Sequence, residues 1–505
     1  MTQKSSLSKT VLLINPQHHR NWKFKESIYS FPIGLMYLGT VLKQSGYHPV
    51  IIDTCVDPDY ESKIQKYLPG SIYAGVSAMT PQVPHAMELA SLIRNIAPET
   101  PIVWGGIHVS LYPESCLDPL CDVSVIGEGD RTCVDLAHAL ETGGNLELVK
   151  GIAFAENNRV IKTPTPELLD ASTLPFIDYD LVDPESYITA YVIQEHRMAR
   201  VIPIHAARGC PWHCTFCINT TLNEQRRYRP RPAKALADEI EALRNRFRIE
   251  GFIIQDEEFF ADRDRILRFL NEIENRGMTD LKYYATSRVN HFRPGYIDRK
   301  FLERLKRCGF VDLVFGFESG SRHCLEIIQK EITVDQGLYT ATLLAETGLK
   351  AVWGFIMGLP GETREDLLKT LRIMEKLRRL SSNNYFIGPQ IFRPYPGSKL
   401  YQKALQYGLR EPKNLREWSR LEFTPEGWFG SESLPWIPEE NRALVKYINV
   451  LAPVYFNRNY LRTQFPGTLF HKFLRVLFAL RLAYNIWIFP HEYRLRNVAA
   501  RFLPR

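Results

Sequence analysis

The sequence predicts an α/β protein with two successive alternations of strands and helices, followed by a mainly helical C-terminal region. Short apolar runs alternate with helical patterns over the first 145 residues, and a second alternation of this kind begins near residue 201. Apolar strands separated by helices are typical of a parallel sheet covered on both faces. The chain has 505 residues, 45% apolar and 24% charged, which is enough for two or three domains with buried cores.

The first alternation contains five runs that we interpret as strands, namely VLLIN (11–15), PVIID (49–53), IYAGVS (72–77), PIVWGG (101–106) and CDVSVIG (121–127). Helical spacing between them predicts a doubly wound sheet over residues 8–145. Ligands of such sheets bind beyond the C-terminal strand ends. Four of these ends are rich in small and polar residues, NPQHH, VSAMT, WGGIH and GEGD. This edge is therefore a predicted binding face, although glycines after strands are also ordinary turn residues.

Two Thr-Pro pairs and little periodicity mark residues 146–200 as a connector. Six further apolar runs follow within residues 201–430, namely VIPIHAA, GFIIQ, KYYATSR, VDLVFGFES, KAVWGFIMG and NYFIGPQIF. Eight strand–helix units make a complete barrel, so six predict an open, partial one. Residues 431–505 then form a helical, basic region.

The positive charge is concentrated at the end of the chain. Residues 456–505 hold nine Lys or Arg and one acid, a net charge of +8, whereas the whole chain carries +7. We see no signal peptide, and no uninterrupted apolar run reaches the roughly 18 residues that a membrane span needs. The nine cysteines show no repeating spacing, which favours a reducing compartment. We therefore expect a cytoplasmic protein.

The stretch RGCPWHCTFCI gathers Cys210, Cys214 and Cys217. The spacing CxxxCxxC suits an iron–sulfur cluster with one iron left unligated by protein, since four cysteines are the usual complement. Structural zinc would also need a fourth ligand, which His213 or His205 could supply. Chance clustering is the remaining interpretation.

This spacing, with an aromatic residue before the last cysteine, resembles the signature of radical S-adenosylmethionine (SAM) enzymes. Further stretches resemble motifs at the later strands of that family, namely QDEEFF (255–260), Arg288, FGFESGS (315–321), GFIMGLPGET (354–363) and RPYPGSKLY (393–401). FPIGLMYLGTVLKQSGY, VWGGIHVSLYPE and VIGEGD resemble the cobalamin-binding domain that precedes the radical core in one large subgroup. The resemblance covers roughly residues 10–430.

The resemblance implies three cofactors. Cys210, Cys214 and Cys217 would hold a [4Fe–4S] cluster whose fourth iron is free for SAM, and a Rossmann-like domain would bind cobalamin before a partial radical SAM barrel. An electron donor such as flavodoxin or ferredoxin would be a partner. The motif DxHxxG, whose histidine replaces the lower ligand of cobalamin in many proteins, does not occur in the sequence. A histidine lower ligand is therefore not expected, and His108 in GGIH receives no ligand role.

Seven further residues are candidates for binding SAM. Asp256 and Glu257 would bind its amino group, and solvated turn carboxylates are the alternative. Arg288 would pair with the methionyl carboxylate in a bidentate fork, against a structural salt bridge. Glu318 and Ser319 would form hydrogen bonds to the ribose hydroxyls. Gly354 and Gly358 would let the backbone approach adenine closely. Glycines in a strand can also mark a bulge alone.

The predicted function is that of a cobalamin-dependent radical methyltransferase. As the resemblance implies, one SAM methylates cobalamin and a second is cleaved to a 5′-deoxyadenosyl radical, which abstracts hydrogen from an unactivated carbon of a small or lipid-like substrate. The alternative is radical cyclisation or rearrangement without net methyl transfer, as in anaerobic porphyrin-ring cyclases. A non-enzymatic cobalamin- or metal-binding regulatory module is a third interpretation, against which the intact CxxxCxxC argues. No RNA-binding motif is seen, so a nucleic-acid partner is not expected.

The stretch LFHKFLRVLFALRLAYNIWIF (469–489) is predicted as an amphipathic helix. Its polar half holds His471, Lys472, Arg475, Arg481 and Asn485. Its apolar half holds Leu469, Phe470, Phe473, Leu477, Leu480, Tyr484 and Ile488. Five apolar residues intrude on the polar half, Leu474, Phe478, Leu482, Ile486 and Phe489. Such a helix either lies in a membrane interface, at the inner membrane surface, or packs on the barrel with its basic side in water.

Overall fold

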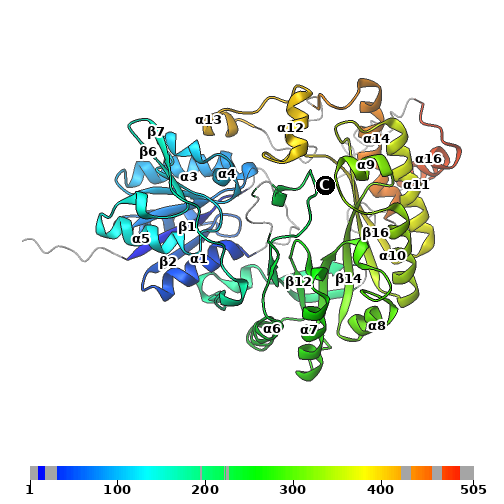
Figure 1. Cartoon of the computed structure of the whole chain (residues 1–505), viewed down its shortest axis with the longest axis horizontal. Helices are drawn as coiled ribbons and strands as arrows, with labels where there is room; N and C mark the ends of the chain where they lie inside the picture. Colours follow the sequence, from blue (N-terminus) through cyan, green and yellow to red (C-terminus); the bar gives the residue numbers. More distant parts are fainter. Residues whose placement is uncertain are drawn as a thin grey trace, which may run out of the picture. The chain divides into compact units, whose positions relative to one another are not determined.

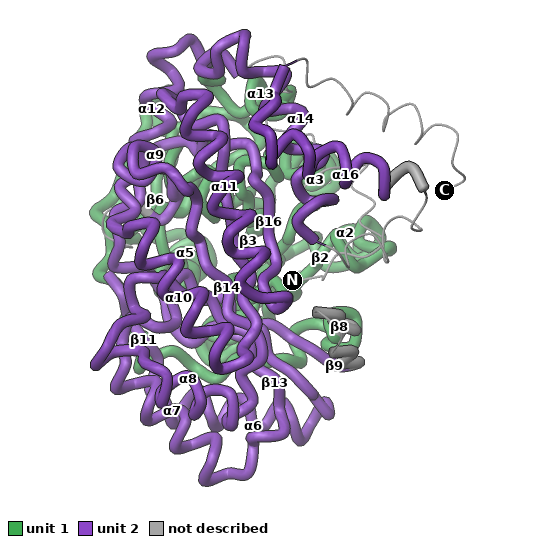
Figure 2. Tube along the Cα trace, turned by 90° about the vertical axis from the view of Figure 1, so that its right-hand side faces the viewer, with its two compact units in different colours: residues 1–191, 410–430 green, residues 192–409, 431–505 purple. Residues whose placement is uncertain are grey.

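The structure is a computed structural model that describes residues 9–17, 31–193, 196–220, 222, 227–421, 434–457 and 469–488. The chain divides into two compact units, residues 1–191 with 410–430 and residues 192–409 with 431–505 (Figure 2). Each unit is built on a sheet of seven strands. No helix among the described residues has both the length and the apolar character needed to cross a membrane.

The first unit contains the strands β1 (Thr10–Asn15), β2 (His48–Asp53), β3 (Tyr73–Ser77), β4 (Ile102–Gly105), β5 (Val123–Val125), β6 (Ile152–Glu156) and β7 (Arg159–Lys162). Their order is β2-β1-β3-β4-β5-β6-β7, and the pairings from β2 to β5 are parallel. One face packs against α1 (Ile33–Gln44) and α5 (Thr132–Thr142), and the other against α2 (Tyr60–Tyr67) and α3 (Val83–Ile96). Helices α1, α3 and α5 are labelled in Figure 1. The predicted doubly wound sheet is confirmed.

The segment that we expected to be a connector, residues 146–200, contains three strands and the start of a fourth. β6 and β7 form a hairpin around Asn157 and Asn158, whose φ angles of 50° and 61° suit a type I′ turn. β8 (Thr189–Ile193) and β9 (His196–Ile204) belong to the second sheet. The hairpin strands are too short to show a period, so the prolines dominate the sequence pattern.

The second unit contains six parallel strands, β9, β12 (Gly251–Ile254), β13 (Lys282–Ser287), β14 (Phe310–Glu318), β15 (Lys350–Met357) and β16 (Asn384–Ile391). They correspond to the six predicted runs. The sheet runs from β16 at one edge to β8 at the other, and among the described strands no pairing joins these edges. The predicted partial barrel is therefore confirmed.

The helices that alternate with these strands are α6 (Ala233–Phe247), α7 (Arg263–Asn275), α8 (Arg299–Arg307), α9 (Arg322–Ile327), α10 (Val334–Thr347) and α11 (Arg364–Leu380) (Figure 1). Local signals delimit them. In α10, Thr333 and Gln336 form a capping box, and Gly348 ends the helix in the left-handed conformation, φ 68°. After β16 come α12 (Lys399–Gln406), α13 (Leu415–Trp418), α14 (Glu439–Phe456) and α16 (Leu469–Tyr484).

Helix α13 belongs to the first unit although it follows the last barrel strand. Trp418 is 1% exposed, and its ring lies 5.4 Å from that of His108 and 5.2 Å from that of Tyr112 (centroid distances). The Tyr112 hydroxyl donates a hydrogen bond to Glu411 over 2.5 Å. Residues 410–421 are thus part of the core of the first unit, which the sequence did not predict.

Helix α16 packs through a face other than the predicted apolar half. Leu474 and Phe478, which intrude on the polar half, are 1% and 0% exposed, and Phe478 stacks on Tyr447 of α14 at 5.8 Å. The aromatic cluster around Phe478 therefore decides which face is buried. The exposed apolar side chains here are Phe473, Val476, Leu480, Tyr484, Ile486 and Ile488.

Candidate active site

The three clustered cysteines lie in one loop, residues 209–218, here called the cysteine loop. It follows β9 and the two-residue strand β10 (Ala207–Arg208), at the C-terminal edge of the sheet where barrel active sites lie. Cys214 is 6% exposed, and Cys210 and Cys217 are half-buried. Burial raises the pKa of the Cys210 thiol to about 12, so this thiol ionises on binding a metal rather than by itself.

Two hydrogen bonds from Thr215 fix the cysteine loop against the end of α9. The Thr215 N–H donates to the Ile328 carbonyl over 2.9 Å, and the Thr215 hydroxyl donates to the Ile327 carbonyl over 3.0 Å. The next cysteines along the chain are not in this loop, because Cys308 ends α8 and Cys324 lies within α9. Three sulfurs in one loop at this edge fit a cluster that leaves one iron open.

Arg288 comes into direct contact with the cysteine loop. It follows β13, is 5% exposed, and its Nη1 lies 3.2 Å from Cys214 Sγ. Nη2 donates to the Lys330 carbonyl, and the guanidinium stacks over the Trp212 ring at 4.2 Å. Its Nε is buried without a partner, and no carboxylate of the described residues forms an ion pair with it. The guanidinium is thus held beside the sulfurs and still has a free donor.

Asp256 anchors the segment that leads into the cysteine loop. It is 2% exposed, and its Oδ1 accepts hydrogen bonds from the N–H groups of Ala206 and Ala207 over 2.6 and 2.9 Å. Its Oδ2 is buried without a partner, and burial raises the pKa of this carboxyl to about 7. The site therefore contains one orphaned carboxylate oxygen, which suits an incoming ammonium group.

The two acids after Asp256 differ from the predicted pair. Glu257 is exposed, whereas Glu258 is 1% exposed and accepts a hydrogen bond from the Phe260 N–H over 3.0 Å. Glu258 also lies 3.5 Å from His291 Nε2. The sequence reasoning missed Glu258, and the available signal was its alternation with Asp256, which puts both on one side of an extended segment.

At the end of β14, Glu318 pairs with a lysine that the sequence did not single out. Its Oε1 lies 2.8 Å from Lys330 Nζ, both side chains are buried, and Glu318 has a φ of 67°. Ser319 is fully buried, and its hydroxyl lies 2.9 Å from that of Thr370 in α11. The structure thus brings Glu318 near the cysteine loop through Lys330, while Ser319 is joined to α11.

The two predicted glycines are in different surroundings. A Cβ on Gly354, inside β15, would lie 3.4 Å from the Phe315 carbonyl, which is an ordinary contact. Gly358 has a φ of 71°, which favours glycine, and its carbonyl accepts a hydrogen bond from Trp436 Nε1 over 2.7 Å. The Gly358 N–H donates to Glu362, whose carboxyl has a pKa raised to about 8 by burial.

Asp366 joins the segments that follow β14 and β15. It bonds to the hydroxyl of Ser321, to His323 Nδ1 over 2.9 Å and to the Thr363 hydroxyl over 2.7 Å. Burial would raise its pKa, but these hydrogen bonds outweigh burial and lower it to about 2. His323, Cys324 and Asp366 are close enough to share a metal ion, yet the oxygens of Asp366 are already bonded. We therefore interpret this cluster as structural.

In the first unit, polar side chains gather where the strand order reverses, between β1 and β3. Ligands of open α/β sheets bind at this point. Asn15 Nδ2 donates to Asp53 Oδ1 over 3.0 Å, Gln82 Nε2 lies 3.3 Å from Asn15 Oδ1, and His85 Nδ1 accepts from the Gln17 N–H over 2.9 Å. This edge is the predicted binding face. Asn15 and Gln17 belong to the predicted strand end NPQHH, whereas Gln82 and His85 were not predicted.

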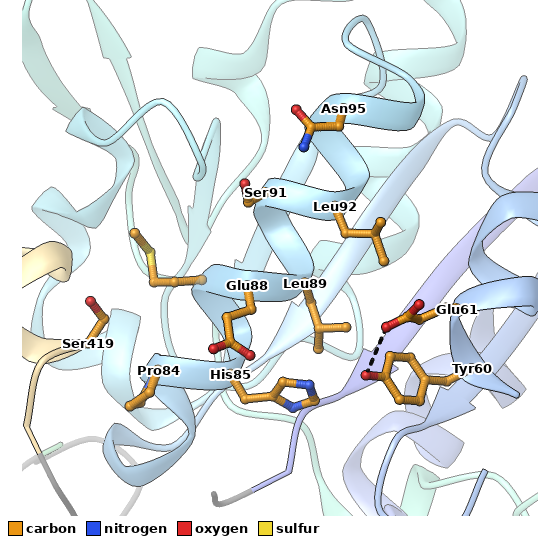
Figure 3. Close-up of a pocket in the computed structure, with 11 residues that line it drawn as sticks. Tyr60, Glu61, Pro84, His85, Glu88, Leu89, Ser91, Leu92, Asn95 and Ser419 are labelled. Carbon is orange, nitrogen blue, oxygen red and sulfur yellow. Dashed lines mark hydrogen bonds between the residues drawn. The ribbon is translucent and has the colours of Figure 1, made fainter. Parts of the chain in front are cut away.

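A pocket of about 570 Å³ lies beside this edge, between the start of α2 and one side of α3 (Figure 3). His85 and Tyr60 face each other there, with their rings 6.0 Å apart, and Ser419 contributes from the segment after α13. The pocket contains none of the predicted site residues.

His108 is enclosed within the first unit. It lies in α4 (Ile107–Leu111), is fully buried, and its Nδ1 is 3.3 Å from the Thr80 hydroxyl. Burial lowers its pKa to about 3, so the imidazole is neutral, and its Nε2 has no partner. The tilted ring of Tyr112 and the edge-on ring of Trp418 pack around it, which explains its burial.

Fold and site together define an enzyme with a cofactor-binding α/β domain before a metal-dependent partial barrel. Residues 204–374 match the model of the radical SAM superfamily, and residues 29–137 match that of the B12 binding domain. The chain therefore contains a radical SAM domain preceded by a B12-binding domain. The resemblance that the motifs indicated is confirmed.

Relatives in this family include two distinct activities. The chain is 29% identical to an uncharacterized methyltransferase of Pyrococcus horikoshii, over 77% of this chain and 82% of the relative. It is 28% identical to the anaerobic magnesium-protoporphyrin IX monomethyl ester cyclase of Cereibacter sphaeroides, over 82% of this chain and 66% of the relative. The solved radical SAM methyltransferase TsrM of Kitasatospora setae, with cobalamin and a [4Fe–4S] cluster bound, shares the fold, with a TM-score of 0.63, 19% identity and coverage of 84% and 83%.

Proposed function

We propose that the protein is a cobalamin-dependent radical SAM methyltransferase that acts on an unactivated carbon of a small or lipid-like substrate. The observation that supports this most is the cysteine loop, with Arg288 against Cys214, in a chain that also carries a B12-binding domain. When bound, the cluster and SAM supply a carbon-centred radical, and cobalamin supplies methyl-transfer chemistry.

The residues of the second unit have defined parts in this proposal. Cys210, Cys214 and Cys217 hold the cluster. The free Oδ2 of Asp256 accepts the ammonium group of SAM, and Arg288 donates to its carboxylate. Glu257, Glu318 and Ser319 remain candidates for the amino group and the ribose, and Gly354 and Gly358 for contact with adenine. Flavodoxin or ferredoxin delivers the electron.

The cysteine assignment is tested by anaerobic reconstitution with iron, sulfide, cobalamin, reductant and SAM. Replacing Cys210, Cys214 or Cys217 by alanine removes a ligand, so 5′-deoxyadenosine formation should be lost in each variant. Cys308→Ala is the matched control, since Cys308 lies at the end of α8 and outside the loop. SAM cleavage that survives in all three loop variants would disprove the assignment.

Radical cyclisation without net methyl transfer is the second candidate function. The match to the magnesium-protoporphyrin cyclase over 82% of this chain favours it. Cyclisation consumes SAM for radical formation alone and yields no S-adenosylhomocysteine. Comparing the products of a deletion strain and its parent by mass spectrometry would identify the substrate in either case.

We also propose that the protein binds a membrane through α16, which would rest on the cytoplasmic face of an anionic membrane. Its exposed Phe473, Val476 and Leu480 would enter the interface, and the exposed Lys472 would face lipid head groups. The wild-type protein should co-sediment with anionic vesicles, less so at high salt. A variant with these three apolar residues changed to serine should remain folded and stay in the supernatant. Equal sedimentation of both proteins would remove the support for a membrane-bound, lipid-like substrate.

A further inference from the structure

A buried lysine lies beside the cysteine loop and has no part in the function proposed above. Lys330 follows α9, is 6% exposed, and its Nζ lies 5.7 Å from the centroid of the Phe216 ring, directly before Cys217. Its carbonyl accepts a hydrogen bond from Arg288, which contacts Cys214. Lys330 therefore touches the loop and its arginine through separate groups.

The backbone around Lys330 is shaped to hold its charge in place. Glu318 Oε1 lies 2.8 Å from the Lys330 ammonium. The backbone of Glu318 is left-handed, with a φ of 67°, a conformation that residues other than glycine rarely adopt. A Cβ on Gly316 would lie 2.9 Å from Lys330 Nζ and would also collide with the Glu318 carboxylate. The pairing of β14 with β15 shifts register between Gly316 and Glu318. Gly316, the register shift after it and the left-handed conformation of Glu318 thus all occur at this ion pair.

The ammonium remains charged despite its burial. Burial lowers the pKa of Lys330, but the Glu318 carboxylate at 2.8 Å opposes this effect, and the pKa is raised overall. An ion pair with both side chains this deeply buried is not retained for stability alone, because apolar replacements of similar volume are often equally stable. Its place beside the sulfurs suggests an electrostatic effect on what they bind.

We propose that Lys330 is a tuning residue whose buried positive charge raises the reduction potential of the cluster held by the cysteine loop. This inference rests on the proposed function, because it requires that cluster. Reduction adds one electron from the external donor to a group that already carries three thiolates. A fixed cation nearby stabilises the more negative, reduced form more than the oxidised form. Glu318 holds the ammonium in position.

The test is a redox titration of the reconstituted protein, followed by electron paramagnetic resonance without SAM or substrate. Lys330→Met removes the charge at similar volume and should lower the reduction equilibrium constant at least tenfold, a shift of about 59 mV to more negative potential for a one-electron couple. Lys330→Arg keeps the charge, so its potential should stay close to that of the wild type. Lys306→Met is the matched control, because Lys306 lies at the C-terminal end of α8 and bonds to the Thr347 carbonyl.

A double variant keeps the test decisive if Lys330→Met alone fails to fold. Glu318→Gln with Lys330→Met removes both charges and leaves no buried charge unpaired, so its cluster should load. Because loss of the Glu318 anion offsets part of the effect, its potential should be more negative than that of the wild type, but by less than in Lys330→Met. A wild-type potential in either variant, with the cluster intact, would overturn the role of Lys330 and leave the proposed function standing. A wild-type protein that binds no cluster would overturn both.

Discussion

Replacing Asp256 by asparagine and by alanine separates the roles of its two carboxylate oxygens. Oδ1 accepts the N–H groups of Ala206 and Ala207, and an asparagine oxygen can accept both of them. Alanine leaves two buried N–H groups without an acceptor. An unmade buried hydrogen bond costs about 1–3 kcal/mol, so Asp256→Ala should lose about 2–6 kcal/mol of stability.

Thermal unfolding of the protein without cofactors measures this difference. For a domain of this size, 1 kcal/mol corresponds to about 2–4 °C in Tm, so Asp256→Ala should melt at least about 4 °C below the wild type. Asp256→Asn should melt close to it at pH 5, where the wild-type carboxyl is protonated in the folded protein. An alanine variant with the wild-type Tm would refute the anchoring role.

The asparagine variant also tests the free oxygen. A hydrogen bond to a charged group contributes about 1.5–3 kcal/mol, so losing the carboxylate charge should weaken SAM binding by roughly 10- to 100-fold. Equilibrium binding to the reconstituted protein provides the measurement, and unchanged affinity would refute the contact with the amino group.

The pH dependence of stability follows from the same carboxyl. Its pKa is raised to about 7 in the folded protein, so the protonated form favours folding. This stabilisation is complete below the unfolded pKa of about 4 and is lost as the pH rises through 7. Asp256→Asn does not titrate, so its Tm should gain on the wild type between pH 5 and 8. A constant difference would contradict the buried, protonated carboxyl.

Three further changes test other parts of the structure. Gly316→Ala places a methyl group against the Glu318–Lys330 pair and should lower both Tm and bound iron, measured after reconstitution; full iron content would contradict the close packing. Glu362→Gln keeps an acceptor for the Gly358 N–H and removes a carboxyl whose pKa is about 8, so the variant should lose less stability than the wild type from pH 6 to 9. Trp418→Ala should cost about 3–5 kcal/mol and unfold the first unit earlier, seen by limited proteolysis, and unchanged protection would show that residues 410–421 are not part of its core.

The architecture was predictable because strands buried on both faces are continuous apolar runs, and all six runs of the barrel became strands. The cysteine loop was visible because its three sulfurs are close along the chain, and its role as a cluster site stays a prediction. Lys330 and Trp212 were not predicted as site residues, since they meet Arg288 only through tertiary contacts.

Two other features depend on partners far away in the sequence. Trp418 packs on His108 although the whole barrel segment lies between them in the sequence, and no local pattern indicates that contact. For α16, a helical wheel assumes that the larger apolar half is buried. Phe478 overrides this assumption because an aromatic cluster on α14 accepts its ring.

Methyl transfer itself is tested most directly by counting two nucleosides in one reaction. The reconstituted protein is incubated anaerobically with reductant, SAM and a lipid extract of the source cells, with and without cobalamin. The predicted result is S-adenosylhomocysteine and 5′-deoxyadenosine in nearly equal amounts, with the S-adenosylhomocysteine dependent on cobalamin. Continued turnover that yields 5′-deoxyadenosine without cobalamin-dependent S-adenosylhomocysteine would contradict a methyltransferase and leave cyclisation or rearrangement.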